Sequence, residues 1–107
     1  MTAPSLVLLG HGSHDPKVPH VSHQIREGLL AIRPELDIHV AFLDHCAPSG
    51  IQVVNKLVSQ GVAEVVFVPL LLSEAFNVQA EVPALLNQIQ ASFPQLRLIA
   101  SRPIGPE

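Results

Sequence analysis

Short apolar runs alternate along this chain with segments in which apolar residues recur at helical spacing, and this alternation constrains the fold more than any other feature. Four short apolar runs lie at residues 5–9, 37–43, 64–71 and 96–100. Runs that are apolar at nearly every position are typical of strands buried on both faces of a sheet. The chain therefore predicts four strands, with three segments that connect them.

The three connecting segments carry the 3.6-residue period of amphipathic helices. Their apolar stripes cover residues 18–32, 51–58 and 82–93. Pro34 ends the first helix, whose start lies between residues 16 and 20, and Ser49 and Gly61 suit the cap and the stop of the second. Pro83 fits the first turn of the third helix, and Pro94 ends it.

The order strand–helix–strand–helix–strand–helix–strand predicts an α/β fold with a parallel sheet, because parallel strands need long crossovers. Right-handed crossovers favour the strand order 2-1-3-4 of a flavodoxin-like fold, with the first helix on one face and the other two helices on the opposite face. A helix after the fourth strand would complete the first face, and no residues remain to form it. We therefore expect a single three-layer domain over residues 1–107, with the final helix missing.

Composition and charge exclude several classes of function. The net charge is −3, six residues are Lys or Arg, and Trp and Tyr are absent, so the chain lacks the basic stripe and stacking aromatics of a nucleic-acid binder. The longest apolar run, residues 65–72, is far shorter than the roughly 20 residues that cross a membrane. The single cysteine, Cys46, forms no internal disulfide, and residues 1–4 lack the basic start of a signal peptide. We therefore expect a cytoplasmic protein that contacts neither nucleic acid nor membrane.

A histidine between two glycines follows the first strand, at the position where open α/β sheets bind ligands. Such ligands lie beyond the carboxyl ends of the strands where the strand order reverses, here between the first and third strands. Gly10 and Gly12 permit tight turns and close backbone approach around His11. A neutral imidazole there serves as a metal ligand or a proton acceptor. The competing interpretation is a polar turn whose histidine only makes hydrogen bonds.

Two further loops border the same crevice. The loop after the second strand contains Asp44, His45 and Cys46, whose side chains are all metal-ligand types, although successive side chains on an extended chain point in opposite directions. After the third strand, Glu74, Asn77 and Glu81 could reach the crevice. Glu81 could instead cap the third helix, since a carboxylate is stabilised near a helix N-terminus.

Three histidines lie outside these loops. They are His20 and His23, on the first helix, and His39, within the second strand. Because His20 and His23 lie off the apolar stripe, we expect them at the surface. We expect His39 to be a packed or edge residue.

Three segments together resemble one known family. They are LVLLGHGSHDP at 6–16, VAFLDHCAPS at 40–49 and VVFVPLLLSEAFNVQAEVP at 65–83. In this order they resemble the CbiX-type sirohydrochlorin chelatases, class II chelatases of cobalamin and sirohaem biosynthesis. The resemblance implies a flavodoxin-like parallel sheet, a homodimer of short chains or a tandem two-domain chain, and ATP-independent insertion of Co²⁺ or Fe²⁺ into sirohydrochlorin. The metal is then a substrate, and the resemblance implies no organic cofactor. This chain resembles the N-terminal half of a tandem chelatase, or a shortened form of one.

The resemblance also implies roles for individual residues. His11 matches the metal-ligating histidine of the family's HGS motif, and Asp44 and Glu81 match acidic positions of its AFLE and DIP patterns. His14 stands where the family usually has arginine, and Asn77 stands where it has its second metal-ligating histidine. On this basis we expect His11, Asp44 and Glu81 to be catalytic. We expect the tetrapyrrole to contact Gly12, Ser13, His14, Ser73 and Asn77, and the metal to bind His11, with His45 as a second candidate ligand.

The departure at Asn77 leaves two other interpretations open. In one, the chain is a degenerate, non-catalytic half that binds tetrapyrrole or packs on a catalytic domain. In the other, it is a small metal-binding protein that uses His11, His14 and His45. The choice between cobalt and iron stays open, because both metals accept imidazole and carboxylate ligands.

Overall fold

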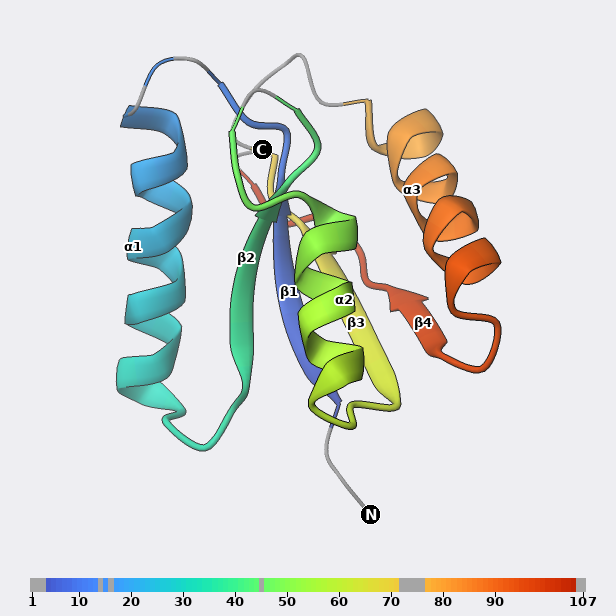
Figure 1. Cartoon of the computed structure of the whole chain (residues 1–107). Helices are drawn as coiled ribbons and strands as arrows, with labels where there is room; N and C mark the ends of the chain where they lie inside the picture. The colour runs from blue at the N-terminus through green and yellow to red at the C-terminus, as the bar shows by residue number, and fades with distance from the viewer. Residues whose placement is uncertain (1–3, 14, 16, 45, 72–76, 106–107) are drawn as a thin grey trace.

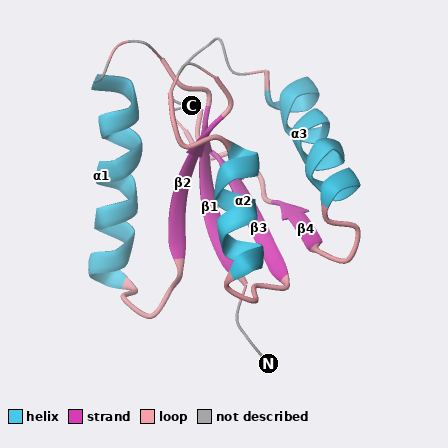
Figure 2. Cartoon of the chain, in the orientation of Figure 1, coloured by secondary structure: helices cyan, strands magenta, loops and turns pink. Residues whose placement is uncertain are grey.

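The computed structural model follows the predicted alternation of strands and helices (Figures 1 and 2). It describes residues 4–13, 15, 17–44, 46–71 and 77–105, with the side chains of these residues except that of Val18. In chain order the elements are β1 (Ser5–Gly10), α1 (Lys17–Ile32), β2 (Ile38–Phe42), α2 (Gly50–Ser59), β3 (Glu64–Pro69), α3 (Val78–Ser92) and β4 (Arg97–Ala100). None of the described helices combines the length and the apolar character that a membrane span requires.

The four strands form one parallel sheet in the order β2-β1-β3-β4, which confirms the predicted topology. β1 pairs with both β2 and β3, so that Val7 lies between His39 and Phe67. β4 pairs with β3, and Glu64 lies opposite Arg97 at the start of this pairing. The strand order therefore reverses between β1 and β3, which is where open α/β sheets place their ligands.

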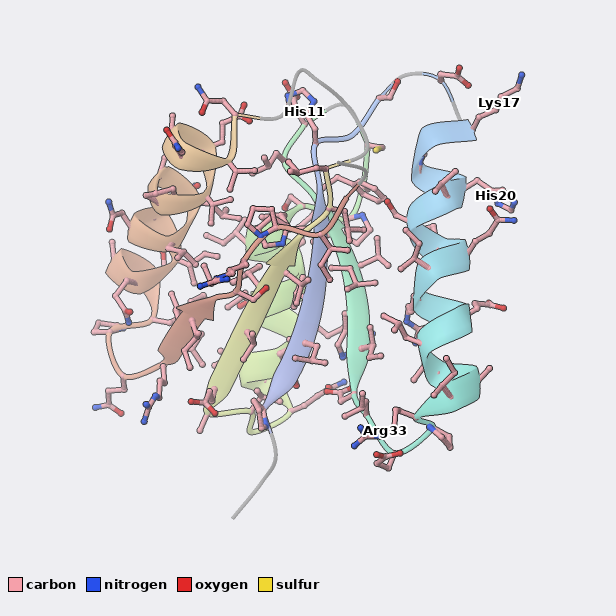
Figure 3. All side chains as sticks on the ribbon, turned by 180° about the vertical axis from the view of Figure 1, so that it is seen from behind. His11, Lys17, His20 and Arg33 are labelled. Atoms are coloured by element: carbon pink, nitrogen blue, oxygen red, sulfur yellow. The ribbon has the colours of Figure 1, made fainter. Side chains whose placement is uncertain are left out.

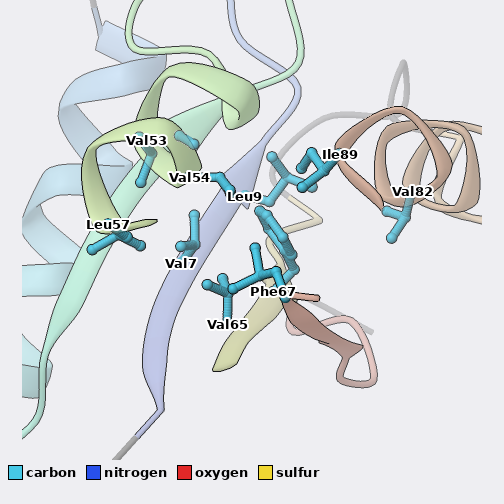
Figure 4. Packing of buried hydrophobic residues seen from close by; sticks show 11 residues of the cluster. Val7, Leu9, Val53, Val54, Leu57, Val65, Phe67, Val82 and Ile89 are labelled. Atoms are coloured by element: carbon cyan, nitrogen blue, oxygen red, sulfur yellow. The ribbon is translucent and has the colours of Figure 1, made fainter. Parts of the chain in front are cut away.

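The α2–α3 face of the sheet carries the larger part of the core. Val7 and Leu9 of β1 and Phe67 of β3 are fully buried there, with Leu57 of α2 and Ile89 of α3 (Figure 4). Burial of one such side chain contributes about 1.5–3 kcal/mol. This packing fixes α2 and α3 on one side of the sheet, as the right-handed crossovers predict.

Helix α1 packs on the opposite face of the sheet, as predicted. Leu8 of β1 and Val40 and Phe42 of β2 are buried there, and Ile25 and Leu30 of α1 pack against them. These contacts place α1 over the β2–β1 half of this face (Figure 3). In the described part of the chain, no helix covers the other half.

The uncovered half of the α1 face carries an apolar group that we call the open sheet face, defined by Val66, Val68 and Ile99. The Glu64–Arg97 ion pair lies beside it at the start of β3 and β4. The two valines of β3 are half-buried, and Ile99 of β4 is 38% exposed. Residues 101–105 do not fold across it. Instead Ile104 N–H donates to the Pro69 carbonyl at 2.8 Å and its own carbonyl accepts from Leu71 N–H at 2.7 Å, so this segment lies alongside β3.

The ends of α2 are as predicted. The Ser49 side chain accepts a hydrogen bond from Gln52 N–H, and the Gln52 side chain accepts one from Ser49 N–H, which makes a complete capping box. Beyond the helix, Gly61 has a φ of +88°, the left-handed conformation typical of a helix stop.

Helix α3 begins four residues before the predicted stripe, and the placement of Pro83 in its first turn is wrong. Asn77 is the N-cap, because its side-chain oxygen accepts a hydrogen bond from Ala80 N–H at 3.3 Å. The helix therefore begins at Val78, and Pro83 lies in its second turn. Asparagine is among the strongest N-cap residues, and its cap outweighs the preference of proline for the first turn.

Candidate functional site

The loops after β1 and β2 are held against each other at the carboxyl end of the sheet. Asp44 N–H donates to the His11 carbonyl and Leu43 N–H donates to the Gly10 carbonyl, each at 2.9 Å. Gly12 has a φ of +95°, and a Cβ atom on it would lie 1.7 Å from the Asp44 carbonyl oxygen. Only glycine permits this conformation and this approach, as the sequence predicts for the turn around His11.

The His11 side chain lies between its own loop and the start of α3. It is 16% exposed, and its Nε2 is 3.6 Å from Oε1 of Glu81. Its Nδ1 is 3.3 Å from the Gly12 carbonyl oxygen, which can only accept a hydrogen bond. A protonated Nδ1 donates to that carbonyl, and a proton or a cation at Nε2 would lie between the imidazole and the carboxylate. Figure 3 shows His11 at the end of the sheet opposite Arg33.

The Glu81 carboxylate connects His11 to the N-terminus of α3. Its Oε2 accepts a hydrogen bond from Asn77 N–H at 2.9 Å, while its Oε1 faces His11. A negative charge is favourable in the first turn of a helix, where backbone N–H groups lack partners. The two interpretations of Glu81, helix cap and crevice residue, therefore both describe its position.

The other predicted site residues divide into two groups. The Asp44 backbone is hydrogen-bonded to that of His11, and the Asp44 side chain is exposed. Ser13 is half-buried, and its hydroxyl accepts a hydrogen bond from Asp15 N–H at 3.1 Å. The predicted positions His14, His45, Ser73 and Glu74 lie outside the described residues. The catalytic and substrate-binding roles given to all these residues stay predictions.

An imidazole nitrogen and a carboxylate oxygen 3.6 Å apart have the chemistry of two ligands to one divalent cation. Metal–nitrogen and metal–oxygen distances to such ligands are about 2.0–2.2 Å, so both atoms can contact one ion without large movement. In the described ranges, no three His, Cys, Asp or Glu side chains gather in a way that could hold a metal.

Cys46 lies beside this region without joining the pair. Its Sγ is 3.9 Å from the Asp44 carbonyl oxygen and would be 3.3 Å from a Cβ atom on Gly12. The side chain also packs against the buried cluster under α1. This position indicates a packing contribution, which the sequence alone does not predict.

The fold and this pair define an open-sheet α/β protein with an imidazole–carboxylate pair beyond the carboxyl ends of its strands. The chain belongs to the CbiX family, because the sequence model of that family matches residues 5–107. The predicted resemblance is thereby confirmed.

Two curated relatives of this chain are named sirohydrochlorin cobaltochelatase. This chain is 27% identical over 105 residues to a sirohydrochlorin cobaltochelatase from Priestia megaterium, covering 94% of this chain and 33% of that protein. It is 29% identical over 83 residues to a sirohydrochlorin cobaltochelatase from Methanopyrus kandleri, covering 78% of this chain and 58% of that protein. The chain thus spans between a third and three fifths of these two relatives.

Solved structures share the fold. A CbiX protein of cobalamin (vitamin B12) biosynthesis from Marinobacter aquaeolei matches with a TM-score of 0.81 and 25% identity, covering 98% of this chain and 85% of that chain. SirB from Bacillus subtilis with Fe³⁺ matches with a TM-score of 0.82 and 24% identity, covering 99% of this chain and 42% of that chain. At 24% identity, the likeness to SirB shows a shared fold alone.

Proposed function

We propose that this chain inserts a divalent metal, Co²⁺ or Fe²⁺, into sirohydrochlorin or a closely similar tetrapyrrole, without ATP. Membership of the CbiX family and the names of the curated relatives support this class of reaction. The observation that carries the proposal is the pair formed by His11 Nε2 and Glu81 Oε1 at the point where the strand order reverses. The metal is a substrate in this reaction, and no organic cofactor is involved.

Metal insertion requires a weakly held ion and groups that accept protons. Each divalent ion that enters the macrocycle displaces two pyrrole protons, so charge and atoms balance without a redox step. His11 is the proposed metal contact, and Glu81 is the proposed second contact and proton acceptor, with Asp44 as a further acceptor. A site with open coordination positions suits transfer, because a closed four-ligand site would retain the ion.

The same loop offers donors for the carboxylates of the tetrapyrrole. The backbone N–H groups of Gly12 and Ser13 belong to the turn that carries His11, and such N–H groups bind anions well. The resemblance adds His14, Ser73 and Asn77 as substrate contacts. The candidate ligand His45 belongs to the neighbouring loop.

A non-catalytic half is the second candidate function, and one observation favours it. The Asn77 side chain, which stands at the position of the family's second metal-ligating histidine, is engaged in capping α3 through Ala80 N–H. In this case the chain binds tetrapyrrole or packs against a catalytic partner. We propose for either function that the chain works as a homodimer or beside a tandem second half, in the reducing cytoplasm that suits the Cys46 thiol.

The central test is insertion of Co²⁺ into sirohydrochlorin, followed by the change in its absorption spectrum. We expect His11→Ala to lower the rate to that measured without protein, because the proposed metal contact is lost. We expect Glu81→Gln to lower the rate at least about tenfold while keeping a carbonyl that accepts from Asn77 N–H, since only the charge is removed. His20→Ala, an exposed histidine on α1, is the matched control and should retain the rate of the unmodified protein.

Two accompanying measurements make the result decisive. Circular dichroism must show that each variant is folded, and titration with Co²⁺ alone must show weaker binding by His11→Ala. A folded His11→Ala variant that inserts cobalt at the original rate would remove His11 from the mechanism.

A further inference from the structure

A hollow with several polar side chains lies along the outer edge of β2, away from the His11–Glu81 pair. Its volume is about 300 Å³, at the small end of the range for small-molecule sites. Three elements contribute its nitrogen-bearing side chains, and we call it the β2-edge groove, defined by His23 and Arg26 of α1, His39 of β2, and Gln52 and Lys56 of α2.

The groove concentrates cationic and imidazole groups in a chain whose net charge is −3. Arg26 and Lys56 are two of its six Lys and Arg residues, and His23 and His39 are two of its six histidines. Among the described residues that line the groove, none is Asp or Glu. Arg26 and Lys56 outnumber the one carboxylate in the described chain that contacts a lining residue, that of Asp37 beside His39, which favours an anionic ligand.

Two of these side chains are held in position by neighbouring groups. Arg26 donates from Nε to the Ile38 carbonyl at 2.6 Å, which leaves its two terminal guanidinium nitrogens for other acceptors. His39 Nε2 is 2.7 Å from Oδ1 of Asp37, whose other carboxylate oxygen accepts from the Ser5 hydroxyl. Fixed donors lose little entropy when a ligand binds.

The edge of β2 is closed on both sides of Val40, which lines the groove. The Ile38 carbonyl is taken by Arg26, and Phe42 N–H donates to the Pro48 carbonyl at 2.9 Å. An added strand needs free backbone groups on alternate residues, so these two bonds prevent strand pairing here. The groove is therefore suited to a compact ligand rather than to an extended peptide.

We propose that the β2-edge groove binds the oxyanion group, phosphate or carboxylate, of a small molecule. Arg26 offers a planar pair of N–H donors and Lys56 a point charge from the opposite wall, and both are standard partners of such groups. The imidazole of His23 lines the same groove, while His39 is held by Asp37. This site does not depend on the proposed metal insertion, since it shares no residue with that site.

Titration of ¹⁵N-labelled protein, followed by two-dimensional NMR, tests the proposal. Sodium phosphate and sodium succinate serve as separate probes at constant ionic strength, with sodium chloride as the reference. We expect saturable shifts at the amides of Arg26, Val40 and Lys56 with at least one probe, and the stronger probe identifies the type of oxyanion. Lys56→Gln should weaken this binding about tenfold, because one charge-assisted contact is lost.

Lys17→Gln is the matched control, because Lys17 is an exposed lysine at the start of α1 and lies outside the groove. It should leave the affinity unchanged. Circular dichroism checks that both variants are folded, which is expected since both lysines are exposed. The proposal is overturned if neither probe gives saturable shifts, if the shifts spread evenly over the cationic residues, or if a folded Lys56→Gln variant binds as tightly as the unmodified protein.

Discussion

The hydrogen bonds of Asn77 and Glu81 determine which side chain at the N-terminus of α3 faces His11. The Asn77 amide oxygen is turned toward Ala80 N–H, and its backbone N–H is taken by Glu81. Glu81 thereby has one oxygen fixed on the helix and the other directed at the imidazole. The Glu81 carboxylate thus faces His11 Nε2 from the start of α3, at 3.6 Å.

At this scale we predict that Asn77→His raises the rate of Co²⁺ insertion into sirohydrochlorin above that of the unmodified chain. The new imidazole adds a ligand beside His11 and Glu81, while loss of the cap lowers the free energy of unfolding by about 1 kcal/mol. Asn77→Ala is the matched control, because it loses the same cap and adds no ligand. If both folded variants have the same insertion rate, the non-catalytic half becomes the better description of the chain.

At the scale of single elements, α2 depends on the capping box that Ser49 forms with Gln52. Ser49→Ala removes the acceptor for Gln52 N–H, and we expect the free energy of unfolding to fall by about 1 kcal/mol in urea denaturation. Ser59→Ala is the control at the other end of the helix, where the exposed hydroxyl donates to the Lys56 carbonyl. Its loss should cost no more than a few tenths of a kcal/mol. Equal losses in the two variants would contradict the role of the cap.

Periodicity was sufficient to predict the strands and helices of the described chain, because apolar spacing shows which side of an element is buried. The strand order came from the rule that crossovers are right-handed, applied to a flavodoxin-like fold. The start of α3 was not predictable in this way. Val78 continues the apolar stripe four residues before Val82, but the cap at Asn77 depends on one side-chain hydrogen bond, which apolar spacing does not report. Pro83 also offered a competing signal for the first turn.

The candidate site was predictable only in part, for a related reason. His11 could be located because the glycines and the strand end lie next to it in the sequence, whereas its contact with Glu81 joins residues from different elements. The β2-edge groove had no sequence signal, since Arg26, His39 and Lys56 belong to α1, β2 and α2. Only the packing of the layers brings them together.

At the scale of the whole molecule, the open sheet face is the main apolar surface without a covering helix in the described chain. Val66, Val68 and Ile99 form it, and Ile104, 57% exposed, lies at the neighbouring edge. Monomeric proteins rarely leave large contiguous apolar patches in water. A second copy that covers this face gains stability in proportion to the apolar area removed from water, at about 25 cal/mol per Å² before the cost of association.

We therefore predict that this chain is a dimer at micromolar concentration. Sedimentation equilibrium should give a species of twice 11.5 kDa. Ile99→Glu places a charge on the open sheet face and should shift the equilibrium to the single chain. Ile32→Glu, at the exposed end of α1, is the control and should leave the dimer intact. A stable species of 11.5 kDa for the unmodified chain would show that this face needs no second copy.

The close approach of Gly12 to the Asp44 carbonyl bears on how fast an ion would bind to and leave His11. Because both loops are already joined through the hydrogen bond from Asp44 N–H to the His11 carbonyl, the imidazole is positioned before the ion arrives. Little chain entropy is lost on binding and little is regained on release. For the proposed ion on His11 and Glu81, we therefore expect the rate of release to follow ligand exchange at these two side chains.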